Sequence, residues 1–317
     1  RYSSTSRGLG DVYKRQSFFT ALLFAIHPVQ VETVCWISAS KIVLSTFFYL
    51  SALICYIQYM RNSKWQYLLA SVVSSILAMG CKEQSVIIVP CLLLFDWMLF
   101  KRNMRSLKVY IEKVYYLIPA IAIFIVTLVA NKNTGEEIIG YTIVDRFIFL
   151  CYSSFKYLLI SAIPFKLSYL YPFPFQVGEK IPMALWIYPF VILFIGYVIY
   201  LNRRKPLLVF CTLFFILHLL PVLHVIPLPR YVVAADRYLY IPYIAFAIGL
   251  SILSYHLYER QRKWILYAGF LYCSYLCVYT AGYAPAWKNS DTLKEHFKEV
   301  LKKRETNLSI NFKHDKQ

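Results

Sequence analysis

The first residues suited to chemistry stand between two apolar runs near the start of the chain. One run ends at His27-Pro28, the next begins at Ile42, and Glu32 and Lys41 lie between them. A charged side chain costs about 2.5–3.5 kcal/mol at the centre of a bilayer, so such groups beside a membrane span usually have a use. We therefore take His27, Glu32 and Lys41 as candidate pocket residues. The alternative is an ordinary loop in which the proline only ends a helix.

A second group of polar residues lies farther along the chain. Lys82 and Glu83 occupy a short turn between two apolar runs. Lys82 and Glu83 are candidate site residues, with Glu83 counted among the pocket residues, although a tight turn needs polar residues in any case. His224, in a later loop, is a further pocket candidate. His218 lies on an apolar helix face, where a histidine is more often part of the core.

Two arginines are candidates for binding a diphosphate or a phosphate diester. Arg230 and Arg237 lie in one loop, and Arg237 stands where that loop re-enters an apolar run, between Asp236 and Tyr238. A guanidinium group can hold a phosphate through two parallel hydrogen bonds. We expect Asp236 to orient the guanidinium group of Arg237 and count it among the pocket residues. The alternative is an arginine that reaches the membrane interface beside aromatic residues.

The composition indicates a membrane protein rather than a soluble enzyme. Of the 317 residues, 59% are hydrophobic and 18% aromatic, and only 16% are charged. Apolar runs of about 16–20 residues, each closed by charged residues, are typical of a polytopic helical membrane protein. The net charge of +18 comes from short clusters between these runs, which fits a membrane surface better than nucleic acid. No HExxH, GxSxG, Walker or GxGxxG motif and no metal-ligand set is found.

The apolar runs define the elements that must position these residues. They cover 17–26, 42–60, 65–80, 85–100, 114–130, 146–163, 184–201, 206–221, 238–257 and 264–281. Four short connections between runs carry clustered cations: Arg61 and Lys64; Lys101, Arg102, Arg105, Lys108 and Lys113; Arg203, Arg204 and Lys205; Arg260, Arg262 and Lys263. The positive-inside rule makes these connections cytoplasmic. Alternation then requires that 146–163 lie at the outer interface or re-enter the membrane without crossing it.

This arrangement predicts an all-α, polytopic membrane bundle with about nine crossings and an outer-side interfacial helix. It places the segments 27–41, 81–84, 131–183 and 222–237 on the outer side, together with the tail after Gly282. Most of the charged and histidine residues that the positive-inside rule does not explain therefore lie on one face, and the spans are expected to be free of charge. Polar groups at the span ends favour chemistry at the interface over passage through the bilayer.

Three parts of the chain are expected. Residues 1–16, RYSSTSRGLGDVYKRQ, have no apolar period and resemble a translated adapter sequence, so we treat them as non-native. Residues 17–281 form the membrane domain, which we expect to be truncated at its N-terminus. Residues 282–317 form an external helical tail.

Five blocks of the sequence resemble the transmembrane and tetratricopeptide-repeat O-mannosyltransferases and their bacterial relatives. They read LLFAIHPVQVETVCWISASKIVLSTFFYLSALICY, MGCKEQSVIIVPCLLLFDW, FKYLLISAIPFKLSYLYPF, AADRYLYIPYIAFAIGL and AWKNSDTLKEHF, and they follow the family's order over most of residues 20–297. The resemblance implies a GT-C glycosyltransferase, a helical membrane bundle that takes a sugar from a polyprenyl phosphate carrier on the outer side.

The resemblance also implies a reaction. A hexose, of which mannose is one candidate, passes from a polyprenyl-phosphate donor to a hydroxyl group of a protein or glycan, with inversion at the anomeric carbon. Arg237, Arg230 and Lys82 would bind the donor phosphate and stabilise the leaving anion. The expected partners are this donor, the acceptor and membrane lipid, with no nucleic acid and no cofactor; the need for a metal is open. The expected location is a bacterial inner membrane with a periplasmic active face, or the endoplasmic reticulum membrane in a eukaryote.

Two parts of the family pattern are missing from this sequence. The acidic pair that acts in the family's first outer loop would lie upstream of Ser17, and the tetratricopeptide repeats would follow residue 300. The catalytic residues are therefore unknown, and we expect the fragment alone to be inactive. The rival interpretation is a transporter or a flippase for lipid-linked sugars, which would show paired broken helices or polar residues near the middle of the membrane.

Overall fold

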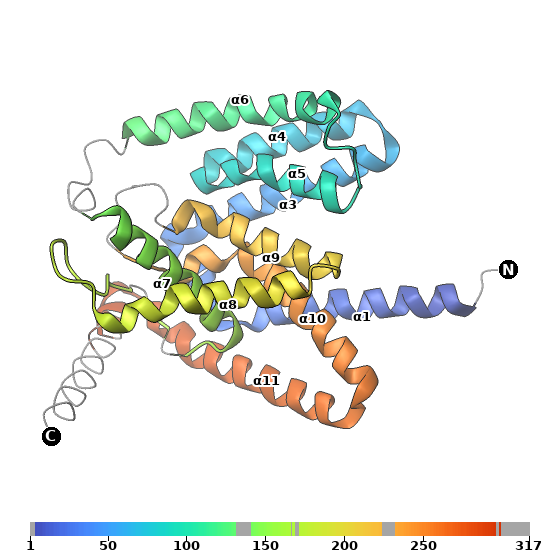
Figure 1. Ribbon diagram of the computed structural model, residues 1–317. Helices are drawn as coiled ribbons and strands as arrows, with labels where there is room; N and C mark the ends of the chain where they lie inside the picture. Colours follow the sequence, from blue (N-terminus) through green and yellow to red (C-terminus); the bar gives the residue numbers. More distant parts are fainter. Residues whose placement is uncertain are drawn as a thin grey trace, which may run out of the picture.

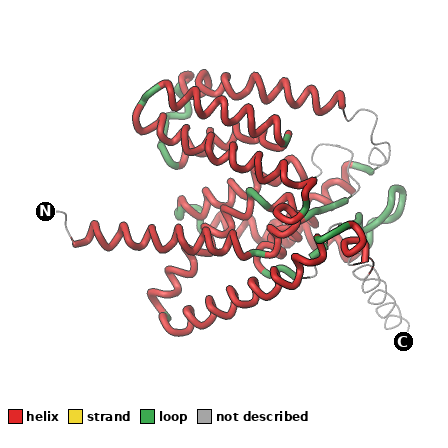
Figure 2. The backbone as a smooth tube through the Cα atoms, turned by 180° about the vertical axis from the view of Figure 1, so that it is seen from behind, coloured by secondary structure: helices red, strands yellow, loops and turns green. Residues whose placement is uncertain are grey.

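The chain folds into helices joined by short connections. The computed structural model describes residues 4–130, 141–165, 167–168, 171–223, 232–295 and 298, with the side chains of all of these except 4–13 and 262. Within them the backbone forms helices and one isolated antiparallel bridge, between Tyr171 and Ala234 (Figures 1 and 2). The predicted all-α fold class is confirmed for the described part of the chain.

The bounds of α3–α5 and α7–α11 lie within about four residues of the apolar runs, whereas α1 and α6 begin well before theirs. The α-helices are α1 (Ser4–Ile26), α2 (Val31–Cys35), α3 (Ser40–Asn62), α4 (Trp65–Cys81), α5 (Ile88–Met98), α6 (Leu107–Ala130), α7 (Ile143–Ala162), α8 (Ile187–Leu201), α9 (Pro206–Leu219), α10 (Pro242–Arg260) and α11 (Arg262–Tyr283). Short 3-10 helices lie between them: η1 (Pro28–Gln30), η2 (Ile37–Ala39), η3 (Glu83–Ile87), η4 (Met183–Trp186), η5 (Leu220–Val222), η6 (Asp236–Leu239) and η7 (Ala284–Trp287).

Proline and capping residues set where several helices begin. Pro28 opens η1, and Pro206 and Pro242 stand in the first turns of α9 and α10. A proline is well placed there because the first-turn N–H groups have no partner inside the helix. Thr142 and Asp145 form a capping box at the start of α7, in which each side chain accepts a hydrogen bond from the backbone of the other.

The helices form two groups. α3, α4, α5 and α6 lie together at the top of Figure 1, and α1 and α7–α11 lie beneath them. α5 packs against α9, and the short helices η1, α2 and η2 lead from the lower group into α3. The largest fully buried side chains are Tyr49, Tyr56, Tyr116, Tyr157, Tyr171, Tyr243, Phe149, Leu23, Met79, Ile88, Leu92 and Ile148. Many buried tyrosines mean many hydroxyl groups that need partners inside the bundle.

The four basic connections lie at the same end of the bundle. The turns α3–α4, α5–α6, α8–α9 and α10–α11 are all found at the right-hand end in Figure 1. We call this the basic end. η3 joins α4 to α5 at the opposite end.

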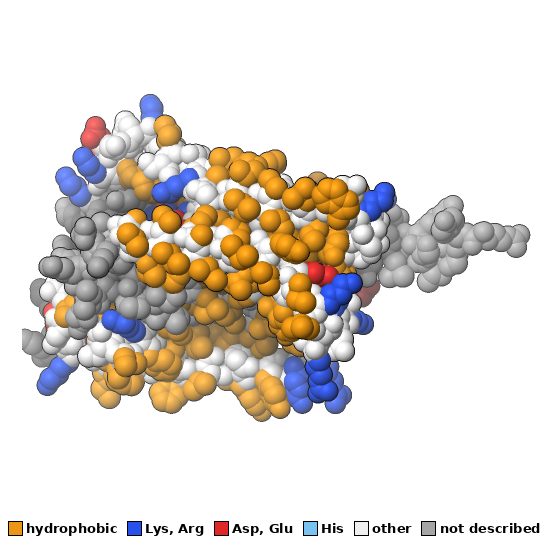
Figure 3. Space-filling model, turned by 90° about the horizontal axis from the view of Figure 1, so that it is seen from above, with side chains coloured by type: hydrophobic (Ala, Val, Ile, Leu, Met, Phe, Trp, Pro, Cys, Tyr) orange, Lys and Arg blue, Asp and Glu red, His pale blue; other side chains and the backbone are white. Residues whose placement is uncertain are grey.

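Several helices are long and apolar enough to cross a membrane. Among the described residues four qualify by length and composition: Ile37–Asn62, Leu107–Ala130, Met183–Leu201 and Lys263–Trp287. The pair Lys14–Ile26 and Pro28–Cys35, bent by 55°, would be a fifth, and Trp65–Cys81 and Pro206–Val222 are shorter apolar helices. α7, which covers most of the segment predicted not to cross, is not among them. Figure 3, viewed from above Figure 1, shows a broad hydrophobic surface. These features are consistent with an integral membrane protein.

The structure corrects two predicted segments and one expectation. α6 begins at Leu107, so Lys113, counted above as a loop cation, is a helical residue and is only 3% exposed. The segment 85–100 is not one helix, because η3 precedes an α5 of 11 residues. The expectation that the spans carry no charge is wrong, since Asp96 in α5 is fully buried beside Lys113. Opposite charges that neutralise each other let both helices bury these groups.

The described residues near both ends of the chain are helical. α1 runs without a break through Ser17, the junction at which the non-native segment was expected to end. Residues 290–295 are helical, and Asn289 caps them by accepting hydrogen bonds from the backbone N–H groups of Asp291 and Thr292.

Candidate functional site

A pocket lies where the two helix groups meet. It is small, with a cavity volume of about 30 Å³. Its walls come from α3, from η3 and the residue before it, from α9, and from the stretch that runs from η6 to the start of α10. The lining residues are Ile42, Ser45, Thr46, Tyr49, Lys82, Gln84, Ser85, Ile87, His218, Arg237, Tyr238, Tyr240, Ile241 and Pro242. Two of the predicted phosphate-binding cations, Lys82 and Arg237, thus border one space.

Glu32 fixes Arg237 in the pocket wall. Arg237 Nη1 donates to Glu32 Oε1 at 2.5 Å, and the Arg237 backbone N–H donates to Oε2 at 2.8 Å. Glu32 is fully buried, whereas the Arg237 side chain is 18% exposed. The guanidinium group also lies 5.6 Å from the ring centroid of Trp36 and 5.1 Å from that of Tyr238. Burial alone would lower the pKa of Arg237, but the Glu32 carboxylate raises it above its ordinary value, so the group stays charged.

Asp236 does not line the pocket, and the prediction that it orients Arg237 is wrong. Its Oδ1 atom accepts a 2.8 Å hydrogen bond from the Tyr171 hydroxyl, and Oδ2 has no hydrogen-bond partner among the described residues. Burial raises the pKa of the Asp236 carboxyl well above its ordinary value, and the nearby charge of Glu32 raises it further, in spite of the bond from Tyr171. The neutral form of Asp236 is therefore favoured.

Lys82 enters the pocket wall beside an exposed carboxylate. Its Nζ atom lies 2.7 Å from Glu83 Oε1, and the two side chains are 16% and 44% exposed. Burial would raise the pKa of Glu83, but the ammonium groups of Lys82 and, farther away, Lys41 bring it below its ordinary value. Lys41 itself is exposed and does not border the pocket. The Lys82–Glu83 pair is a weak, solvent-screened contact, so Lys82 can turn toward a ligand at little cost.

His218 and Tyr49 form a neutral part of the pocket wall. His218 Nδ1 lies 2.8 Å from the Phe214 carbonyl oxygen, and Nε2 lies 2.8 Å from the Tyr49 hydroxyl. A carbonyl only accepts, so Nδ1 carries the proton and Nε2 accepts from Tyr49. His218 is buried as predicted, yet it also borders the pocket, which its apolar helix face gave no reason to expect.

Hydroxyl groups complete the wall between α3 and η3. Ser45 Oγ donates to the Ala78 carbonyl oxygen at 2.9 Å and lies 2.7 Å from Ser85 Oγ. Both serines are nearly inaccessible to solvent. Sequence reasoning missed them, because serines in an apolar run carry no pattern of their own. A signal that could have pointed to them is their position one helical turn from other polar residues, such as Tyr49 on α3.

The remaining predicted residues lie away from the pocket or outside the described residues. His27 is fully buried, and its Nδ1 atom accepts a 3.3 Å hydrogen bond from the Val29 backbone N–H. Its ring lies 4.3 Å from that of Tyr243. It therefore supports the chain at the end of α1 and does not line the pocket. His224 and Arg230 fall outside the described residues.

The pocket combines three kinds of surface. Lys82 and Arg237 supply positive charge, the serines and Tyr49 supply hydroxyl groups, and Ile42, Ile87 and other side chains supply an apolar part. Such a set can bind an anion that carries both hydroxyl groups and a hydrocarbon portion. Within the described residues no group of three or more His, Cys, Asp or Glu side chains could hold a metal ion.

The chain was compared with protein-family models, with curated proteins and with solved structures. None of the three comparisons found a match. The geometry of the pocket and the five sequence blocks quoted above are the features that bear on a function.

Proposed function

We propose that the chain is the membrane part of a GT-C type glycosyltransferase. In this proposal a hexose is transferred from a polyprenyl-phosphate donor to a hydroxyl group of a protein or glycan. The observation that carries the proposal is the pocket that joins Lys82 and Arg237 at the end of the bundle opposite the basic connections. The five sequence blocks support it independently, since both cations fall within them.

The proposed roles follow from the position of each group. Arg237 is held by Glu32 through one guanidinium nitrogen and its backbone N–H, and its side chain also bonds with Tyr238. A guanidinium group has five N–H donors, so these contacts leave donors for a phosphate oxygen. Lys82 approaches from η3 as a point charge with a mobile side chain. When the acceptor oxygen attacks the anomeric carbon, the bond to the phosphate oxygen breaks and negative charge grows on the leaving group. Fixed cations at this position stabilise that charge.

The proposed topology has about nine crossings, with α7 at the outer interface. The basic end faces the cytoplasm, as the clustered Lys and Arg residues favour. The pocket then opens toward the outer side, which is periplasmic if the protein belongs to a bacterial inner membrane. A polyprenyl phosphate has its charge at the interface and its tail in hydrocarbon, and the pocket's mixed lining suits that division.

Donor binding tests the proposal directly. The chain in lipid nanodiscs should bind a polyprenyl-phosphate hexose, and Arg237→Lys should weaken binding about 10- to 150-fold, the effect of losing one charge-assisted hydrogen bond. Arg105→Lys, an exposed residue at the basic end, is the matched control and should bind like the parent. Equal affinity of the parent and Arg237→Lys would show that Arg237 does not bind the donor. A parent that does not bind the polyprenyl-phosphate hexose would contradict the proposed donor.

A second candidate, a transporter or lipid-linked-sugar flippase, is favoured by one observation. Asp96 and Lys113 are charged groups buried within helices, and such groups often mark ion or substrate pathways. The two candidates differ in product. In the full-length protein a transferase gives a labelled acceptor in detergent, whereas a flippase moves labelled donor between the leaflets of a sealed vesicle and leaves its glycosyl bond intact.

A further inference from the structure

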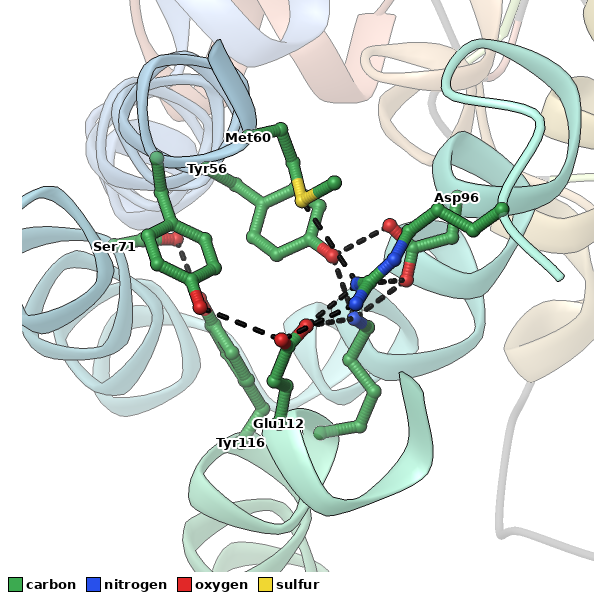
Figure 4. A network of polar contacts seen from close by, with 9 residues as sticks. Tyr56, Met60, Ser71, Asp96, Glu112 and Tyr116 are labelled. Carbon is green, nitrogen blue, oxygen red and sulfur yellow. Dashed lines mark hydrogen bonds and ion pairs between the residues drawn. The ribbon is translucent and has the colours of Figure 1, made fainter. Parts of the chain in front are cut away.

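A buried ion cluster ties helices together near the basic end (Figure 4). Lys113 Nζ lies 2.6 Å from Asp96 Oδ2 and 2.5 Å from the Tyr56 hydroxyl, which donates to Asp96 Oδ1 at 2.6 Å. Arg102 Nη1 lies 2.5 Å from Glu112 Oε2 and 3.4 Å from Asp96 Oδ2. Asp96 is fully buried, and Lys113 and Glu112 are 3% and 7% exposed. Two acids and two bases thus balance in one place, drawn from α5, α6 and the α5–α6 connection, and Tyr56 adds a hydroxyl group from α3.

Further polar contacts continue from the ion cluster toward the pocket. The Tyr116 hydroxyl donates to Ser71 Oγ at 2.8 Å, and Ser71 donates to the Ala52 carbonyl oxygen at 2.7 Å, which links α6, α4 and α3. Next along α3 comes the contact of Ser45 with Ser85 in the pocket wall. Tyr56 and Ser45 lie about 16 Å apart along the helix, from a rise of 1.5 Å per residue. Polar contacts therefore join neighbouring elements at three successive levels: α3, α5 and α6 at the ion cluster, α3, α4 and α6 at Ser71, and α3, α4 and η3 at Ser45.

We propose that the ion cluster positions one wall of the pocket. η3, which carries Ser85 and directly follows Lys82, packs against α4, α5 and α6. The register of these helices therefore sets where Lys82 stands relative to Arg237 across the pocket. The cluster holds that register at the far end of the helices. The competing explanation is that the cluster only neutralises charges that the helices happen to bury.

The two explanations differ for a variant that removes one acid and one base together. A net-neutral replacement of a buried ion pair often leaves stability unchanged. In Asp96→Asn/Lys113→Met no new uncompensated charge arises within that pair, so simple neutralisation predicts an unaltered pocket. Positioning predicts that the wall at η3 loosens, because the bonds among Tyr56, Asp96 and Lys113 are lost.

The test measures the reaction of Ser85→Cys with N-ethylmaleimide, in the full chain in nanodiscs with the native cysteines replaced. Ser85 is 3% exposed, so a loosened wall should raise the labelling rate. We expect a rise of about 10-fold or more in Asp96→Asn/Lys113→Met, the effect of losing one charge-assisted hydrogen bond. Arg105→Met, in the same connection but exposed, should label at the parental rate.

Tyr56→Phe keeps the inference falsifiable if the double variant does not fold, because it removes one hydroxyl and no charge. It should raise the labelling rate in the same direction. Parental labelling rates in whichever of these variants fold would overturn the inference. The role of the positioned wall in binding a donor phosphate rests on the proposed function, but the labelling measurement does not. Failure to bind a polyprenyl-phosphate hexose would overturn the proposed function and leave the labelling result standing.

Discussion

The pair formed by Glu32 and Arg237 allows a quantitative prediction about stability. Glu32 is fully buried and Arg237 is 18% exposed, and the carboxylate accepts from both the side chain and the backbone of the arginine. Removing one partner of a buried ion pair typically costs about 3–5 kcal/mol. Glu32→Gln should lower the free energy of unfolding by about 3 kcal/mol, because the unpaired guanidinium group keeps some contact with solvent and two aromatic neighbours. Arg237→Met should lower it by about 5 kcal/mol, because the unpaired Glu32 carboxylate has no access to water.

The double variant Glu32→Gln/Arg237→Met should be much less destabilised than the sum of the single variants. A coupling free energy of about 2 kcal/mol or more is expected for two groups that share these bonds. The assay is reversible unfolding in mixed micelles, with added dodecyl sulfate as denaturant and circular dichroism as signal. Lys82→Met/Glu83→Gln is the matched control, because a pair whose carboxylate is 44% exposed should couple by about 1 kcal/mol or less. If the single changes at Glu32 and Arg237 simply add, the pair is not the support for η6 that the geometry indicates.

Three other outcomes are expected. First, single cysteines are placed in a variant without native cysteines, and intact cells are treated with an impermeant thiol reagent. Cysteines at Gln176 and Asn289 should react, and a cysteine at Asn103 should react only after permeabilisation. Labelling of Asn103 in intact cells would reverse the proposed orientation. Tyr171→Phe should lower the free energy of unfolding by about 1–3 kcal/mol, because Asp236 loses its hydrogen-bond donor; an unchanged unfolding curve would contradict this. Burial raises the folded-state pKa of Asp236 above its ordinary 3.8. The difference in the free energy of unfolding between the parent and Asp236→Asn should therefore favour the parent most below about pH 4. It should decline as the pH rises toward the raised pKa. A difference that does not vary with pH would argue against a neutral Asp236.

The sequence was sufficient for the helices and insufficient for the contacts between them. The apolar runs predicted α3 and α4 to within a few residues, because hydrophobic length is a local property. The start of α6 was missed, because Lys113 was counted with the loop cations although the structure neutralises it with Asp96 from another helix.

In the candidate site, too, the sequence identified individual residues but not the contacts between them. Lys82 and Arg237 were selected by residue type and by their place at the ends of apolar runs, and the structure brings them to one pocket. Asp236 was chosen as the partner of Arg237 because it is adjacent in sequence, but adjacent side chains need not face each other. The actual partner, Glu32, is distant in the chain, so only the fold could reveal it.

That long separation also sets the order in which the pocket can be made. Glu32 and the arginine that neutralises it are 205 residues apart, and α10 follows directly after that arginine. At a synthesis rate of about 5–20 residues per second, roughly 10–40 s pass between the appearance of the two side chains. During that interval the carboxylate has no arginine partner, and the pocket lacks the wall from Arg237 to Pro242. The pocket is therefore absent until α10 has emerged, and a chain that inserts α10 wrongly would lack a binding site altogether.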